Sequence, residues 1–117
     1  MTIQAGASLP TRGKAGTSSW TSNCPANQVV VGFSGRSGLL VDQIALRCAP
    51  LGVSSATSGS SLTVGTATSL GAIGGTGGSA FAAVNCPTGE VATMARVRTG
   101  DNLDAFGLAC AKGTIGP

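Results

Sequence analysis

Apolar positions come in short runs that are interrupted every few residues by Gly, Ser, Thr or Pro. This punctuation is typical of strands and turns. The 19 Gly residues disfavour long helices, because each interior helical Gly costs roughly 1 kcal/mol. The pattern predicts one all-β domain of antiparallel sheets over residues 1–117.

An internal duplication organises this pattern. Cys24–Cys48 can be laid on Cys86–Cys110 without a gap, by the single shift that carries Cys24 onto Cys86. Eight identities fall in register, in the order Cys, Pro, Val, Arg, Gly, Asp, Leu and Cys. Chance does not explain so many, so the chain is predicted to contain two copies of one unit.

The copies extend upstream of the cysteines. Trp20 aligns with Phe81 when the alignment is shifted by one residue, and both side chains are expected to anchor the core. The units then cover about 12–50 and 74–111. The Ser/Thr/Gly-rich connector over 51–73 is predicted to hold one short hairpin around Leu62 to Val64 or to be a flexible linker.

The cysteine spacing predicts how the thiols pair. Cys48 follows Cys24 at the same distance along the chain as Cys110 follows Cys86. A hairpin centred near Arg36, or near Arg98 in the second unit, brings each pair face to face. Each bridge would contribute on the order of 3 kcal/mol. The predicted bridges are Cys24–Cys48 and Cys86–Cys110.

A disulfide framework indicates a secreted or extracellular protein, although residues 1–7 show no signal peptide. The alternative is a cytoplasmic protein with free buried thiols, which the regular spacing disfavours.

Alternation in the last strand of each unit predicts which side chains face inward. The outer face of the second unit carries only small side chains, which permits close approach of another sheet. The inner residues are Ile44, Leu46, Cys48, Phe106, Leu108 and Cys110, and the outer ones are Gln43, Ala45, Arg47, Ala105, Gly107 and Ala109.

Charge is sparse, at 9% of residues against roughly 25% in an average globular protein. There is no basic cluster, no Tyr and one Trp, so nucleic acid is not an expected partner. No apolar run approaches the ~20 residues of a membrane span. A weakly charged surface favours packing against copies of the same chain or against another protein, and a homo-oligomer is expected.

The sequence contains few of the residues that catalysis requires. Nucleophilic catalysis usually needs a His base, and the chain has none. The four carboxylates form no obvious pair, because the repeat-matched Asp42 and Asp104 lie in separate units. We therefore expect no enzyme, no cofactor and no metal site.

One motif suggests a binding site. Both units carry Gly-x-x-x-Asp, as Gly38–Asp42 and Gly100–Asp104, where the chain enters the last strand. Gly lets a ligand approach the backbone, and an Asp carboxylate accepts hydrogen bonds from hydroxyls, which suits a sugar ring. We expect the Gly-rich loop ahead of each unit to wrap the pocket of that unit. The candidate carbohydrate-binding residues are Gly13, Gly16, Gly38, Leu39, Leu40, Asp42, Gly77, Gly78, Gly100, Asp101, Asn102 and Asp104.

A structural alternative explains the same motif. Asp42 and Asp104 would cap their own turns, as Asp commonly does. Arg36 and Arg98 would each form a clamp with the Asp of their own loop.

Two segments resemble a known family. Residues 32–44 resemble the ligand loop of jacalin-related lectins, and residues 74–81 resemble the Gly-rich loop of that family. The Cys-Pro openings and closing cysteines resemble the related β-prism of egg vitelline-membrane outer-layer proteins. The resemblance implies a β-prism of three Greek-key sheets, with sugar held between the two loops by the Asp and neighbouring amides.

The chain departs from that family in showing two clear units rather than three, and in having Val97 where the first unit has Gly35. The sequence thus predicts a lectin-like carbohydrate-binding protein with two pseudo-equivalent sites. The alternative is a self-associating structural subunit of an extracellular oligomer or fibre without a small-molecule ligand.

Overall fold

A computed structural model describes residues 20–56, 59–100 and 102–113. Those residues form strands and loops, all strand pairings are antiparallel, and no helix long and apolar enough to cross a membrane occurs among them. The all-β prediction is confirmed. The strands are β1 (Gln28–Ser37), β2 (Val41–Ala56), β3 (Gly59–Val64), β4 (Thr68–Ser69), β5 (Ile73–Gly74), β6 (Ser79–Asn85), β7 (Glu90–Thr99) and β8 (Leu103–Lys112).

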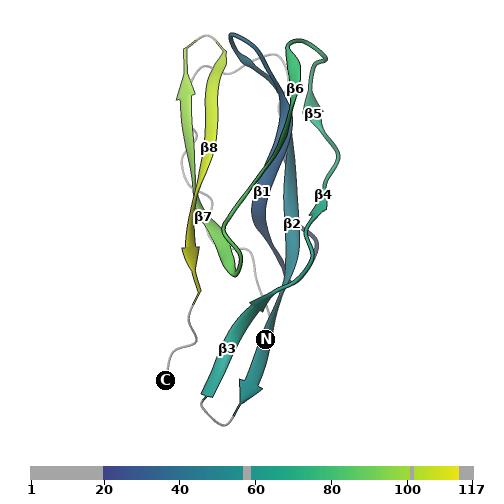
Figure 1. Cartoon of the computed structure of the whole chain (residues 1–117). Helices are drawn as coiled ribbons and strands as arrows, with labels where there is room; N and C mark the ends of the chain where they lie inside the picture. Colours follow the sequence, from purple (N-terminus) through teal and green to yellow (C-terminus); the bar gives the residue numbers. More distant parts are fainter. Residues whose placement is uncertain (1–19, 57–58, 101, 114–117) are drawn as a thin grey trace.

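The larger sheet is built around β1 and β2. Its order is β3-β2-β1-β6, and the short strands β4 and β5 also pair with β2. The second half of β2 leaves β1 and pairs with β3, so this hairpin extends beyond the rest of the sheet (Figure 1). The connector therefore contains a hairpin, as the first of the two sequence alternatives predicted.

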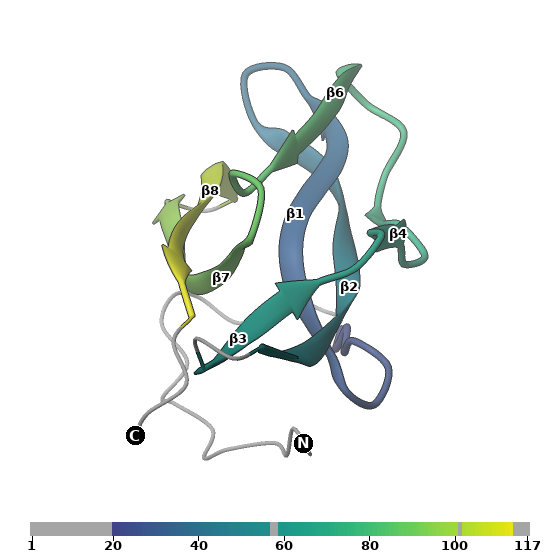
Figure 2. The ribbon, with the colours of Figure 1, turned by 60° about the horizontal axis from the view of Figure 1, so that its bottom comes forward.

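The smaller sheet is the β7–β8 hairpin, which lies alongside the larger one (Figure 2). Phe33 joins the two sheets. Its ring packs edge-on against Phe106 at 4.9 Å and against Phe81 at 5.8 Å between centroids. The core of the described residues is small, and its buried apolar members are Val31, Phe33, Ala45, Cys48 and Ala49.

The two hairpins have the same register. Every Cα pair of β1–β2 has a counterpart in β7–β8 under the shift that carries Cys24 onto Cys86, from Gln28↔Pro50 and Glu90↔Lys112 onward. Both hairpins carry register shifts at the same two places. The two hairpins are therefore built alike, including their irregularities.

The predicted turn position is wrong by a few residues. The first hairpin reverses at Gly38–Leu40, where the Gly38 N–H donates to the Leu40 carbonyl at 2.9 Å, and Arg36 lies inside β1. Cys48 consequently faces Val30 rather than Cys24. The prediction set the register by placing Cys24 opposite Cys48, although Cys24 lies before the first strand.

Both predicted disulfides are nevertheless present, with Cα atoms 5.7 and 5.8 Å apart. The chain turns sharply just after Cys24, where Gln28 N–H donates to the Pro25 carbonyl and Asn27 has a φ of 61°. The counterpart of Asn27 in the second unit is Gly89, with a φ of 82°. A local turn, and not the hairpin register, therefore brings each pair of cysteines together.

Two burial predictions are corrected. Trp20 is 66% exposed and does not anchor the core of the single chain, unlike Phe81. Ala45 is only 7% exposed although alternation assigned it to the outer face. Its methyl group is short, and β2 has strands along both edges, so neighbouring side chains shield it.

Candidate functional site

The candidate site lies where two loops meet at one end of the larger sheet. β5 pairs with Gln43 and Ile44, and Gly75 N–H donates to the Asp42 carbonyl at 2.8 Å. A Cβ on Gly38 would lie 3.5 Å from the Cα of Gly78. The Gly-x-x-x-Asp loop of the first unit and the Gly-rich loop over 74–78 thus form one surface.

The way in which these two loops pair contradicts the prediction made from the sequence. We expected each Gly-rich loop to wrap the pocket of its own unit, but Gly77 and Gly78 lie against Asp42 of the other unit. The reason is that β6, which follows this loop, pairs with β1 and carries the loop to the first hairpin. Gly13 and Gly16 lie outside the described residues.

Asp42 owes its position to a β-bulge. Arg36 pairs with Gln43 and Ser37 pairs with Val41, which leaves Asp42 as the extra residue of β2. A bulge bends a strand locally and re-aims the side chain of the extra residue. Strand alternation alone therefore does not give the direction of this carboxylate.

The Asp42 carboxylate rests directly on glycine backbone. A Cβ on Gly77 would come within 2.9 Å of its Oδ1, and one on Gly78 within 2.5 Å of its Oδ2. Gly78 also has a φ of 64°, which favours glycine. Any larger residue at either position would displace the carboxylate, so the glycines shape the site.

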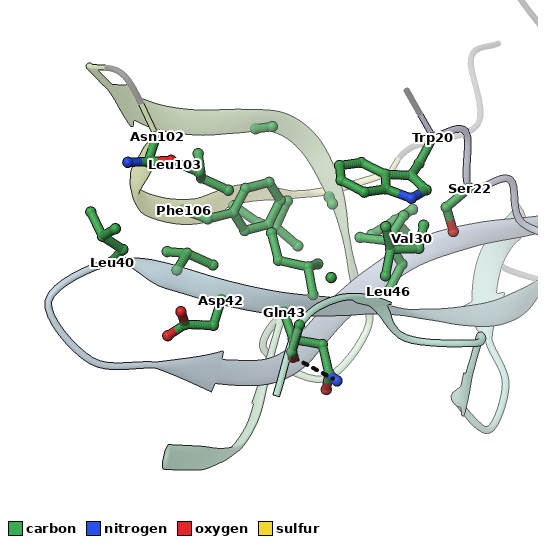
Figure 3. Close-up of a pocket in the computed structure, with 18 of the residues that line it drawn as sticks. Trp20, Ser22, Val30, Leu40, Asp42, Gln43, Leu46, Asn102, Leu103 and Phe106 are labelled. Carbon is green, nitrogen blue, oxygen red and sulfur yellow. Dashed lines mark hydrogen bonds between the residues drawn. The ribbon is translucent and has the colours of Figure 1, made fainter. Parts of the chain in front are cut away.

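Two side chains brace the Gly-rich loop. Arg36 donates from Nε to the Gly77 carbonyl at 3.1 Å and from Nη2 to the Gly78 carbonyl at 2.9 Å. Gln43 donates from Nε2 to the Gly75 carbonyl at 3.3 Å, the dashed line of Figure 3. Sequence reasoning missed both roles, since they depend on a loop that is remote along the chain.

Arg36 is therefore a loop brace and not a clamp on Asp42. Its guanidinium bonds to carbonyls, and the Asp42 carboxylate accepts no hydrogen bond from any described residue. The half-buried carboxylate keeps its acceptor capacity for a ligand.

The second Gly-x-x-x-Asp loop has the same bulge and the same turn hydrogen bond as the first. Asp104 is again the extra residue of a bulge, between Arg98↔Ala105 and Thr99↔Leu103. Gly100 N–H donates to the Asn102 carbonyl at 3.0 Å, as in the first loop. No Gly-rich loop lies against Asp104 within the described residues, and Asp101 lies outside them. Among the described residues, therefore, a Gly-rich loop lies against the Asp42 carboxylate only.

An apolar groove of about 910 Å³ separates the two hairpins (Figure 3). Trp20 lies at the opposite end of this groove from Asn102 (Figure 3). The groove depends on how the two sheets pack, so no local pattern in the sequence could reveal it. Its apolar lining includes Trp20, Val30, Leu40, Leu46, Leu103 and Phe106.

The remaining predicted ligand residues are on the surface. The Leu39 side chain is fully exposed at the tip of the first turn and Leu40 is half-buried beside the groove. Comparison of the chain with family models, curated proteins and solved structures finds no match.

Proposed function

We propose that the chain is a lectin-like carbohydrate-binding protein whose site in a single chain is the one at Asp42. The observation that carries the proposal is the Asp42 carboxylate, held against Gly77 and Gly78 and accepting no hydrogen bond from any described residue. A sugar hydroxyl would donate to this carboxylate in a charge-assisted hydrogen bond, worth about 1.5–3 kcal/mol.

Backbone access supports the same ligand class. Glycines surround the carboxylate, so a sugar ring can approach main-chain groups that side chains would otherwise cover. Arg36 and Gln43 hold the loop in place before any ligand arrives, which lowers the entropic cost of binding. We propose binding rather than catalysis at this site, because the chain has no His to activate a nucleophile.

The proposal includes a fold relationship and a location. We infer that the two hairpins arose by duplication and that the architecture is related to the β-prism of jacalin-like lectins, which the shared register supports. Two disulfides support secretion.

Asp42→Asn tests the site, with Asp104→Asn as the matched control. A glycan array identifies the sugar, and calorimetric titration measures its affinity. Asp42→Asn should weaken monosaccharide binding about tenfold to a hundredfold, because it removes a charge-assisted hydrogen bond. Asp104→Asn should leave that affinity unchanged.

A turn-capping role for Asp42 predicts the reverse result. Asp42→Asn would then lower the melting temperature and leave the affinity as it was. That outcome, or a glycan array on which the unmodified chain binds nothing, would remove the proposal.

A second candidate function is self-association of a structural subunit. One observation favours it: β7 is exposed from Thr93 to Thr99 and has no neighbour on one edge among the described residues.

A further inference from the structure

The edge of β7 that faces away from β8 has no paired strand among the described residues. On this strand Met94 is 58% exposed and Val97 is 56% exposed. A two-stranded hairpin is at best marginally stable alone, and an open edge is a template for a further strand. The β7–β8 hairpin would therefore gain stability from a third strand along Met94–Thr99.

The equivalent edge of the first hairpin is covered by a strand of the same chain. Gly32–Ser37 of β1 is the counterpart of Met94–Thr99 in the shared register of the two hairpins. β6 pairs antiparallel along this stretch of β1. Because β6 directly precedes Cys86 of the second unit, a strand that leads into one unit covers the hairpin of the other unit.

The counterpart of β6 in the first unit is the segment directly before Cys24, and this segment already lies beside β7. Trp20 and Ser22 line the groove between the hairpins together with Ala92–Ala95 of β7 (Figure 3). Thr21 is not part of the groove lining, so its two neighbours face the same side, as alternate residues of an extended strand do. The chain thus brings its own segment to the edge that lacks a strand.

Alignment of this segment with β6 gives its register on β7. Between Phe33↔Val84 and Gly35↔Phe81, β6 contains one residue more than β1. Trp20 is one residue closer to its cysteine than Phe81 is, so the segment fits as a regular strand without this bulge. The resulting pairs are Asn23 with Met94, Ser22 with Ala95, Thr21 with Arg96, Trp20 with Val97, Ser19 with Arg98 and Ser18 with Thr99.

Side-chain size and charge agree with this register. Trp20 comes to lie near Ala95, whose counterpart in the first hairpin is the bulky Phe33, so there is room for an indole ring. Trp20 is 66% exposed and would gain contact area there. Residues 18–23 carry no charge, so no arginine of β7 meets a like charge across the new ladder.

We propose that residues 18–23 add to β7 of the same chain as its missing edge strand, as β6 adds to β1. Residues 18 and 19 lie outside the described residues and directly precede Trp20. The two units then exchange edge strands within one chain, and this edge of β7 is closed to other chains. The proposal does not rest on sugar binding, and it removes the open edge that favoured self-association of a structural subunit.

A cysteine cross-link at the far end of the new ladder tests the proposal. In the double variant Ser18→Cys/Thr99→Cys the two positions face each other, within reach of a disulfide. After folding and mild oxidation at low protein concentration, most of the protein should run as a monomer without free thiols, and peptide mapping should join positions 18 and 99. In the control Ser19→Cys/Thr99→Cys the two side chains point to opposite faces of the sheet, and the thiols should stay free.

Each other outcome overturns the proposal. A covalent dimer joined through positions 18 and 99 would mean that another copy supplies the strand. Free thiols in Ser18→Cys/Thr99→Cys, or equal yields of linked protein from both variants, would remove the register.

Hydrogen exchange on the unmodified chain does not depend on the folding of these variants. Consecutive amides of Ala95–Thr99 should all be protected at every protein concentration, because β8 and the new strand bind alternate ones. Rapid exchange of every second amide would show that the edge is open. Protection that is lost on dilution would show that a second copy covers it.

Discussion

The β1–β2 and β7–β8 hairpins share one register, the same two register shifts and a disulfide across the same span, yet their surroundings differ. β6 covers the edge of β1, and β4 and β5 cover that of β2, whereas in the described part of the chain β7 and β8 pair only with each other. Phe33 in the first hairpin is 5% exposed, while most of β7 is open to solvent. The geometry of each hairpin is therefore set by its own residues, whereas its burial depends on which other strands pack beside it.

The largest difference in stability between equivalent substitutions in the two hairpins is expected at the core position Phe33. Phe33→Ala removes a ring that contacts Phe81 and Phe106, and should cost about 3–5 kcal/mol in the free energy of unfolding. Its counterpart is already Ala95, so Ala95→Gly should cost only about 0.5–1 kcal/mol. Urea denaturation of both variants measures the difference. Similar midpoints would show that the two hairpins are equally buried, contrary to the structure.

Removing one disulfide at a time should give nearly equal losses. Each bridge closes a loop with a sequence separation of 24, so chain entropy predicts about 3–4 kcal/mol for either paired Cys→Ala variant. Cys48 is fully buried, which should make the loss of the first bridge somewhat larger. Thermal melts of the two variants measure the stability lost with each bridge. A much larger loss for the second bridge would mean that the exposed hairpin depends on its disulfide more than the loop length implies.

Gly35 and Val97 occupy equivalent positions, but substitution by alanine should destabilise the chain by different amounts. A Cβ on Gly35 would collide with the Gln43 carbonyl, so Gly35→Ala should cost about 1–3 kcal/mol through displaced backbone. Val97 is more than half exposed, so Val97→Ala should cost less than about 1 kcal/mol. Denaturation midpoints of the two alanine variants decide the point, and a tolerated Gly35→Ala would mean that the two strands can separate there at no cost.

The smallest effect on stability concerns the two arginines. Arg36→Met removes two exposed hydrogen bonds to the Gly-rich loop and should lower stability by about 1 kcal/mol. If the Asp42 site binds sugar, that variant should also bind it more weakly, because the loop is no longer braced. Arg98→Met has no loop to release and should change neither property. Melting curves and titrations on both variants test this, and equal effects would mean that bracing by Arg36 is unimportant.

Much of the fold follows from residue patterns that act over short distances. The Gly, Ser and Thr punctuation indicated an all-β chain, and the spacing of Cys24 and Cys48 indicated their bridge. The turn position was missed by a few residues, since a turn at Pro25–Gln28 can bring the cysteines together without the register we assumed.

The sequence by itself determined the strands, the two disulfides and the two Gly-x-x-x-Asp loops, because these depend on local turns and on alternation. Only the tertiary structure decided that Gly77 and Gly78 would meet Asp42 rather than Asp104. That choice depends on which hairpin β6 joins, and the two hairpins present the same register to it. The ring of Phe81 packs edge-on against Phe33 and so stabilises β6 on β1, whereas the equivalent position of β7 is Ala95, which has no ring to contact.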